Sequence, residues 1–310
     1  MDRWIEVLRT VLPVAVMLGI GMVCRATGGI RREGIDALKS VAVNIALPAV
    51  LLNAFATTAY TPMDVAVPLV MFAVCLLAWA LGKLGGRLFH MRSRFVPFLT
   101  TGFEAGMLGY ALFTMLYGSG RIAEFARIDL GQVLFVFTAY KVLLGMSGAE
   151  KPSANQLARE MLTSPIIVAI VAGVLLGATG LYRALEPSGL SRALDACTDF
   201  VSAPVSALIL LCIGYDLLPG SIPWRDTLSV VGLRLGVMLI LRLALGALFR
   251  AVWPEAALDA ALNVMFILPP PFVLPVFADD PDQRVYISSA LSASTLVAIV
   301  GFAVLAAIGI

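Results

Sequence analysis

The sequence contains few charged residues and a single histidine. Charged residues make up 14% of the 310 residues, and His90 is the one histidine, whereas a soluble domain carries about a quarter charged residues. The four cysteines lie in apolar stretches without CxxC spacing, and no HExxH or paired-aspartate motif is present. The formal charge of +2 is too small to indicate nucleic-acid binding. We therefore expect neither an enzyme nor a metal or cofactor site.

Long apolar runs dominate the chain. Hydrophobic residues make up 60% of it, and the mean hydropathy is +0.95, which indicates an integral membrane protein. A membrane-spanning helix needs about 20 apolar residues, and this criterion predicts an all-α fold with ten spans. The predicted spans are 8–27, 35–58, 64–89, 95–117, 125–145, 164–183, 194–217, 227–253, 258–277 and 284–308.

Basic residues are more frequent in the loops that follow odd-numbered spans. The first two of these loops contain Arg25, Arg31, Arg32, Arg87 and Arg92. Positively charged loops tend to stay in the cytoplasm. We therefore predict a multi-pass protein of the cell's inner (cytoplasmic) membrane, with both termini outside the cytoplasm.

The two halves of the chain resemble each other. "LPVAVMLGIGMVCRATGGI" at 12–30 aligns with "SPIIVAIVAGVLLGATGLY" at 164–182, with a proline, a glycine (Gly21 and Gly173) and an Ala-Thr-Gly triplet in matching places. A repeat unit of five spans places the second copy in the opposite orientation, so the repeats are inverted. The predicted divisions are a first repeat at 1–146, a cytoplasmic linker at 147–163 and a second repeat at 164–310.

Corresponding spans of the two halves are interrupted. The fourth span contains Gly102, Gly106 and Gly109, and the ninth contains "LNVMFILPPPFVLPVF", whose consecutive prolines cannot continue an ordinary helix. Such breaks must be buried in protein or face a water-filled cavity. Paired breaks in inverted repeats are typical of secondary transporters, which bind substrate where the broken helices meet. The prolines are Pro269, Pro270, Pro271 and Pro275.

Two motifs carry a family resemblance that covers essentially the whole chain. "VNIALPAVLLNAF" at 43–55 and "SAPVSALILLCIGYDL" at 202–217 resemble the second and seventh spans of the auxin efflux carrier family, and the short central loop resembles its prokaryotic members. The resemblance implies the fold of the bile acid sodium symporters and elevator-type transport of organic anions. It implies a scaffold of spans 1, 2, 6 and 7, which forms homodimer contacts in some members, and a transport domain of spans 3–5 and 8–10.

Glu104 departs from the family pattern. It stands where the family has an asparagine, and Ala111 stands where the family has a proline, while Gly106 and Gly109 keep their places. An ionised Glu104 would repel an anionic substrate. Intramembrane acids are costly and usually functional, and removal from water favours the protonated carboxyl. Glu104 is therefore interpreted as a proton site, as a ligand for sodium or an amine, or as a structural residue.

Three further polar residues are candidates for the site. Asn263 belongs to the ninth span, and Asn44 lies in the second span, where helix packing explains an amide equally well. Asp199 lies five residues before Pro204 and is a candidate second ion or substrate residue.

We predict a carrier of small carboxylates that works by alternating access and is coupled to protons through Glu104. The alternatives are coupling to sodium, transport of an amine or other cation, and a channel. The predicted substrate or ion site consists of Glu104, Gly106, Gly109, Asn263, Pro269, Pro270, Pro271, Asn44 and Asp199.

Overall fold

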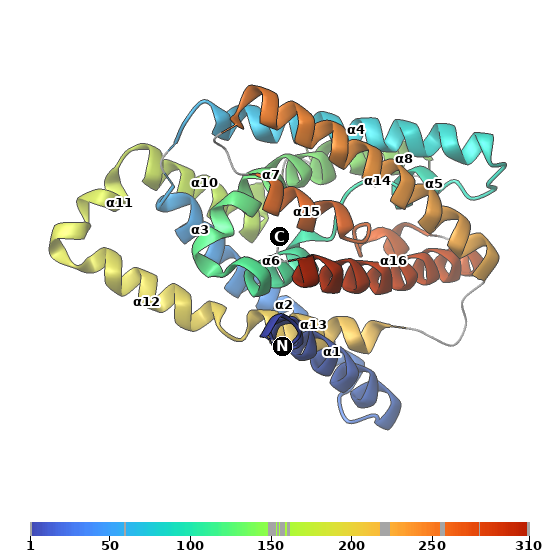
Figure 1. The fold of residues 1–310 in the computed structure, drawn as a ribbon, viewed down its shortest axis with the longest axis horizontal. Coiled ribbons are helices and arrows are strands. Elements are labelled where there is room, and N and C mark those ends of the chain that lie inside the picture. Colours follow the sequence, from blue (N-terminus) through green and yellow to red (C-terminus); the bar gives the residue numbers. More distant parts are fainter. Residues whose placement is uncertain are drawn as a thin grey trace.

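The chain folds into helices throughout the part that the structure describes. The computed structural model describes residues 2–58, 60–147, 153, 155, 159, 162–217, 224–254, 258–278 and 280–308, and none of these forms a β-strand. Helices α4 and α14 lie along one side of the bundle and α1 with α13 along the other, with α15 and α16 between them (Figure 1). Most of the predicted linker at 147–163 lies outside the described residues.

The first half of the chain forms the elements up to α8. These are α1 (Asp2–Thr27), α2 (Arg32–Val41), η1 (Ala42–Ala46), α3 (Leu47–Ala56), α4 (Met63–Leu88), α5 (Val96–Leu99), η2 (Ala105–Gly109), α6 (Tyr110–Tyr117), η3 (Ser119–Arg121), α7 (Ile122–Phe135), η4 (Val136–Tyr140) and α8 (Lys141–Ser147). The second half forms α10 (Pro165–Ala178), α11 (Leu181–Ala184), η5 (Glu186–Ser188), α12 (Leu190–Ser202), α13 (Val205–Asp216), α14 (Trp224–Val252), α15 (Asp259–Ile267), η7 (Leu274–Phe277) and α16 (Pro281–Ile308).

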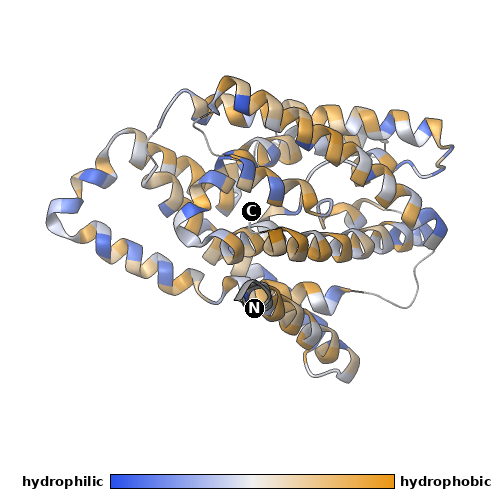
Figure 2. Cartoon of the chain, viewed as in Figure 1, coloured by the Kyte–Doolittle hydropathy of each residue, from blue (hydrophilic) through white to orange (hydrophobic). Residues whose placement is uncertain are grey.

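Several helices have the length and composition of membrane spans. Among the described residues, six are long and apolar enough to cross a membrane, and Pro165–Ala178 together with Leu181–Ser188, bent by 65°, would make a seventh. Hydrophobic residues make up much of every long helix (Figure 2), and many large apolar residues, such as Leu239 and Val300, are exposed. Such a surface is stable in lipid and would be costly in water. The chain therefore has the structure expected of an all-α, multi-pass membrane protein.

Two pairs of helices pack with their backbones in contact. In α1, a Cβ atom added to Gly21 would lie 2.1 Å from the carbonyl oxygen of Leu211 in α13. In α10, a Cβ atom added to Gly173 would lie 2.6 Å from the carbonyl oxygen of Leu52 in α3. Helices in lipid gain stability mainly from close packing, which small residues permit. The two glycines therefore allow α1 to pack on α13, and α10 on α3.

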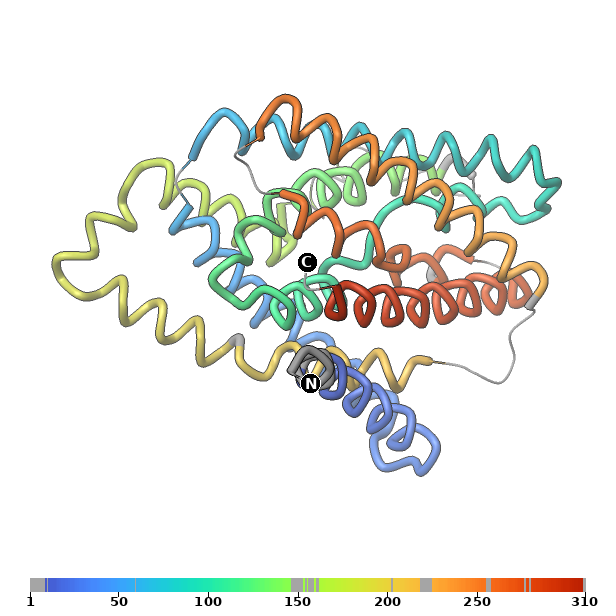
Figure 3. Tube along the Cα trace, in the orientation of Figure 1, coloured from blue at the N-terminus to red at the C-terminus, as the bar shows by residue number. Residues whose placement is uncertain are grey.

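Two interrupted segments meet inside the bundle. After α5 the chain runs without helix through Thr100–Glu104 into η2 and α6, and after α15 it runs without helix through Leu268–Val273. Helix α15 contacts both η2 and α6, and the two segments lie side by side in the interior of the trace (Figure 3). Buried aromatic residues such as Phe98, Phe125 and Tyr140 pack around them. The two predicted breaks thus form one crossing, which is where the candidate site lies.

Candidate functional site

A cavity of about 820 Å³ reaches the crossing of the two interrupted segments. Its inner wall includes Phe103, Glu104 and Gly106 from the first segment and Pro271 and Phe272 from the second. Helices α2, α3, α7, α13 and α16 contribute most of the remaining wall residues, and α1, α6, α8 and α10 contribute one residue each. Pockets of several hundred cubic ångströms accommodate small organic molecules. The cavity is therefore large enough for a small substrate in contact with both breaks.

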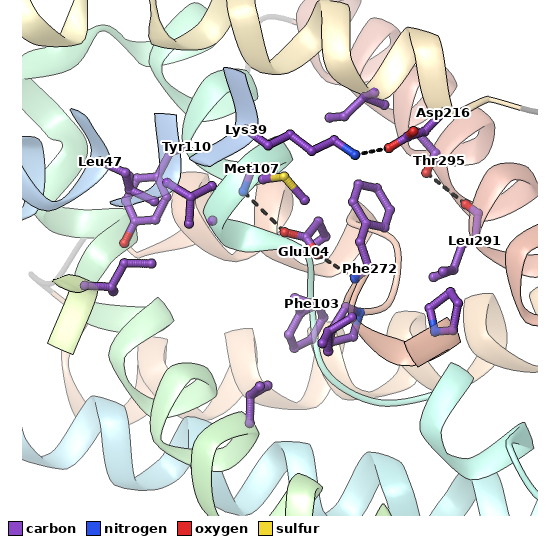
Figure 4. Close-up of a pocket in the computed structure, with 18 of the residues that line it drawn as sticks. Lys39, Leu47, Phe103, Glu104, Met107, Tyr110, Asp216, Phe272, Leu291 and Thr295 are labelled. Atoms are coloured by element: carbon purple, nitrogen blue, oxygen red, sulfur yellow. Dashed lines mark hydrogen bonds and ion pairs between the residues drawn. The ribbon is translucent and has the colours of Figure 1, made fainter. Parts of the chain in front are cut away.

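The carboxylate of Glu104 connects the two breaks. Its Oε2 accepts a hydrogen bond from the Phe272 N–H at 2.6 Å, and its Oε1 accepts a longer one from the Met107 N–H at 3.3 Å (Figure 4). Its own N–H donates to the carbonyl oxygen of Pro269 at 2.9 Å. Because N–H groups at the start of a helix favour negative charge, this geometry suits an ionised carboxylate. Glu104 thereby occupies the N–H groups that would otherwise be available to an anionic ligand.

Glycine and proline account for the close approach of the two segments. Gly102 has φ +67°, which a residue with a Cβ atom rarely adopts, and a Cβ atom there would lie 2.9 Å from Cγ of Pro271. Gly109 is similarly confined, because a Cβ atom there would lie 2.7 Å from side-chain atoms of Leu268 and Phe125. Gly106 differs, since a Cβ atom would meet only ordinary contacts, the nearest at 3.8 Å. Gly102 and Gly109 thus hold the crossing together, whereas Gly106 lines the cavity.

These contacts predict opposite results for two alanine substitutions. Gly102→Ala should lower the free energy of unfolding by about 3 kcal/mol, because it combines a left-handed backbone with overpacking against Pro271. Gly106→Ala should change it by less than about 1 kcal/mol. Thermal unfolding of the purified variants in detergent would measure both. A Gly102→Ala protein as stable as Gly106→Ala would contradict the packing described.

Arg234 of α14 binds the carbonyl side of the same crossing. Its guanidinium donates to the carbonyl oxygens of Leu99 at 3.1 Å, Gly102 at 2.8 Å and Leu268 at 2.9 Å. A weaker fourth contact, at 3.5 Å, joins it to the carbonyl oxygen of Thr101. The side chain is 3% exposed, and its guanidinium carbon lies 5.6 Å from the centre of the Phe103 ring. The crossing therefore has a bound cation at its carbonyl groups and a bound carboxylate at its N–H groups.

A second acid, Asp129 of α7, also lines the cavity. It is 2% exposed and accepts hydrogen bonds from the Tyr110 hydroxyl at 2.9 Å and from Gln132 Nε2 at 3.1 Å. The same Gln132 nitrogen donates to the carbonyl oxygen of Phe103 at 3.1 Å, so the cluster is connected to the first break. The sequence interpretation did not include Asp129. An acid within the predicted fifth span, 125–145, was the signal that could have identified it.

Charged residues line another part of the cavity. Lys39 of α2 and Asp216 of α13 form an ion pair (Figure 4), which Arg32 joins through a 2.5 Å contact with Asp216. Arg25 and Lys141 also line the cavity. The Arg32 side chain is 55% exposed and that of Lys39 20%, so this part of the cavity leads towards the surface. The whole cavity is lined by four basic residues and three acids, Glu104, Asp129 and Asp216, and a small excess of basic groups favours anions over cations.

The predicted site residues fall into three groups. Glu104, Gly106 and Pro271 line the cavity. Gly109, Pro269 and Pro270 are buried in or beside the two breaks, where Pro269 accepts the hydrogen bond from the Glu104 N–H. The last three, Asn44, Asp199 and Asn263, are not among the residues that line the cavity.

Local contacts explain why these three residues lie apart from the cavity. Asn44 is exposed, and its Nδ2 donates to the Ser40 hydroxyl one turn earlier at 3.0 Å. Asp199 lies on an exposed face of α12. Asn263 Oδ1 accepts a hydrogen bond from Nε of Arg242 at 2.8 Å, so it binds α14. None of these three residues therefore shares the wall of the cavity with Glu104.

Comparisons with known proteins do not assign the chain to a family. The chain matches none of the protein-family models against which it was compared, and the search of curated proteins found no match. A functional proposal for this chain therefore depends on its sequence motifs and on the geometry of the crossing.

Proposed function

We propose that the protein is a secondary active transporter that moves a small organic anion across the membrane by alternating access. The observation that carries this proposal is the cavity that reaches two interrupted helical segments, with Glu104 bonded to N–H groups beside both breaks. Interrupted helices that surround a central site are the usual binding arrangement of such transporters. The chemistry of the site requires no enzymatic step.

Helix packing supports the finer proposal of ten spans in two inverted repeats. The segments aligned in sequence are α1 and α10, and each packs through its matching glycine, Gly21 or Gly173, on a helix of the other half. Their partners α13 and α3 contain the two motifs that resemble the auxin efflux carrier family. Reciprocal packing of this kind is expected when the two halves are related by a twofold axis. We accordingly propose membership of that family, with the domains and homodimer contacts that the resemblance implies.

The charges around the cavity favour an anionic substrate. Lys39 projects into the cavity near Glu104 (Figure 4), while the carboxylate of Glu104 occupies the N–H groups of the crossing. A substrate carboxylate is therefore expected to bind Lys39 and to displace Asp216 from it. The charged part of the cavity lies where α1 ends, α2 begins and α13 ends, which is the side predicted to be cytoplasmic. The cavity would then face the cytoplasm of a cell whose inner membrane contains the protein.

The two hydrogen bonds of Glu104 support the proposal of coupling to protons. Both oxygens accept from backbone N–H groups, and a protonated carboxyl is a weaker acceptor whose O–H needs a partner of its own. Binding a proton would therefore weaken the connection between Met107 and Phe272. A protonated Glu104 also no longer repels a substrate carboxylate. The proton and the anion would therefore bind to the same state of the protein, in which the hydrogen bonds between the two interrupted segments are weaker.

The sodium-coupled alternative has less support at this position. A sodium ion prefers several oxygen ligands, but the oxygens of Glu104 already accept hydrogen bonds from N–H groups. The nearby carbonyl oxygens accept hydrogen bonds from Arg234.

A channel has less support than a carrier, because selectivity filters use symmetric rings of groups, whereas the two halves of this crossing carry different residues.

Transport in liposomes would test the proposal. Purified protein would be reconstituted with an entrapped pH-sensitive dye, and a panel of monocarboxylates and dicarboxylates would be added outside at two pH values. We expect saturable proton entry that depends on the carboxylate and exceeds the signal in protein-free liposomes. A response to amines or to sodium gradients alone would overturn the organic-anion proposal. A flux that does not saturate and shows no exchange would indicate a channel.

A further inference from the structure

The carbonyl groups at the crossing form a cation site that is filled by the protein itself. We propose that the Arg234 guanidinium is a permanent, protein-borne cation at this site, where other broken-helix transporters can bind a dissociable ion. The protein would then need no sodium ion at the crossing. The part of this inference that concerns transport rests on the proposed function. The part that concerns the site does not.

The first argument is the convergence of carbonyl groups from two distant segments. Leu99 is the last residue of α5, and Leu268 directly follows the last residue of α15. Carbonyl groups at the end of a helix lack partners within the helix and carry partial negative charge. Here they point to one place together with the carbonyl of Gly102. Unwound carbonyls and half-helix C-termini are the groups with which transporters coordinate cations.

The second argument is that a cation is needed there. These carbonyl groups belong to buried residues, and a buried polar group that is left without a partner destabilises the fold. Arg234 supplies donors to all of them from a single side chain, and its planar guanidinium has five N–H groups for this purpose. Lysine has one ammonium nitrogen and could not reach acceptors on both segments in the same way.

The third argument is the absence of an acidic partner. Within the part of the chain that the structure describes, Arg234 forms no ion pair, and its polar contacts are backbone carbonyls. Arg242, two turns later on the same helix, is instead paired with Asp259 at 2.7 Å. An arginine whose role is to neutralise an acid would be paired with a carboxylate, as Arg242 is. Arg234 therefore has the environment of a coordinated ion.

Chemical rescue would test the inference. We would prepare Arg234→Ala and Arg234→Lys, with Arg242→Ala as the matched control, and measure thermal unfolding in detergent. Guanidinium, sodium, choline and urea would be added at about 10 mM, far below denaturing concentrations. The Arg234→Ala protein would be purified in guanidinium, which is then removed by dialysis, so that the variant is folded at the start.

We expect Arg234→Ala to lose roughly 10 °C in Tm, since buried carbonyls lose their donors. Guanidinium should restore part of this loss, whereas urea and choline should not. Sodium should also stabilise Arg234→Ala if this ion, which is smaller than guanidinium, can bind the carbonyl groups that Arg234 contacts in the wild type. Arg234→Lys should be less stable than the wild type, and Arg242→Ala should gain nothing from guanidinium.

Three outcomes would overturn the inference. One is an Arg234→Ala protein as stable as the wild type, and another is a loss of stability that no small cation restores. The third is a wild type that sodium stabilises relative to choline, because its site would then not be filled. If transport occurs, replacing sodium by choline should leave the wild-type rate unchanged. If no carboxylate is transported, the proposed function fails while the stability results still decide the role of Arg234.

Discussion

Glu104→Gln is expected to abolish the pH dependence of transport and to lower its rate roughly 10- to 100-fold. The glutamine side chain cannot exchange a proton. It also offers one acceptor oxygen where the carboxylate offers two, so its amide N–H₂ would face the N–H of Met107 or Phe272. Leaving one such donor unpaired costs about 1–3 kcal/mol, which corresponds to the stated range of rates. Uptake of a radiolabelled carboxylate at two pH values would measure both effects, and the entrapped dye would show whether protons still enter.

The control for Glu104→Gln is Asp199→Asn, which makes the same change of charge on the exposed face of α12. That variant should retain the wild-type rate and pH profile. A Glu104→Gln protein that still transports protons would exclude Glu104 as the coupling residue. Asp129, the other acid that lines the cavity, would then be tested as Asp129→Asn.

Lys39→Gln is expected to raise the KM for a carboxylate substrate about 30-fold with little change in maximal rate. Lys39 is the basic residue drawn near Glu104 in Figure 4, and its side chain is largely withdrawn from solvent. Charge pairs of this kind are worth about 2 kcal/mol, which corresponds to the stated factor. The dependence of uptake on substrate concentration would separate KM from maximal rate.

Arg32→Gln is the matched control for Lys39→Gln. Both residues pair with Asp216, but the Arg32 side chain is 55% exposed, and exposed ion pairs contribute about 0–1 kcal/mol. We expect its KM to change less than about fivefold. Equal effects of the two substitutions would indicate that the cavity attracts anions through its overall charge, without a specific contact at Lys39.

The sequence predicts an all-α membrane protein and the two breaks in its helices, and the structure contains both. Apolar runs identify the helices, and glycine or proline in the fourth and ninth predicted spans identifies the two breaks, because these residues act locally on the backbone. The acid at Glu104 is visible for the same reason, as a charge in an apolar run. All three features are found in the structure at the crossing.

Contacts between distant segments are harder to predict. The carbonyls that bind Arg234 lie 132–135 residues before it and 34 residues after it, and no spacing in the sequence relates them. The direction in which the Asn44 side chain points is hard to predict for another reason. In lipid, both faces of a helix can be apolar, so the sequence does not reveal that Asn44 points outwards while its neighbour Val43 lines the cavity.

The glycine contacts between helices limit the ways in which the protein can move. A Cβ atom on Gly21 or Gly173 would lie 2.1 Å or 2.6 Å from a carbonyl oxygen of the opposing helix, so sliding a larger residue into either place would require the two helices to separate. The pairs α1–α13 and α3–α10 therefore keep a fixed register. In the proposed transport cycle, relative displacement would therefore occur where these pairs meet the remaining helices, and the pairs themselves would serve as the frame.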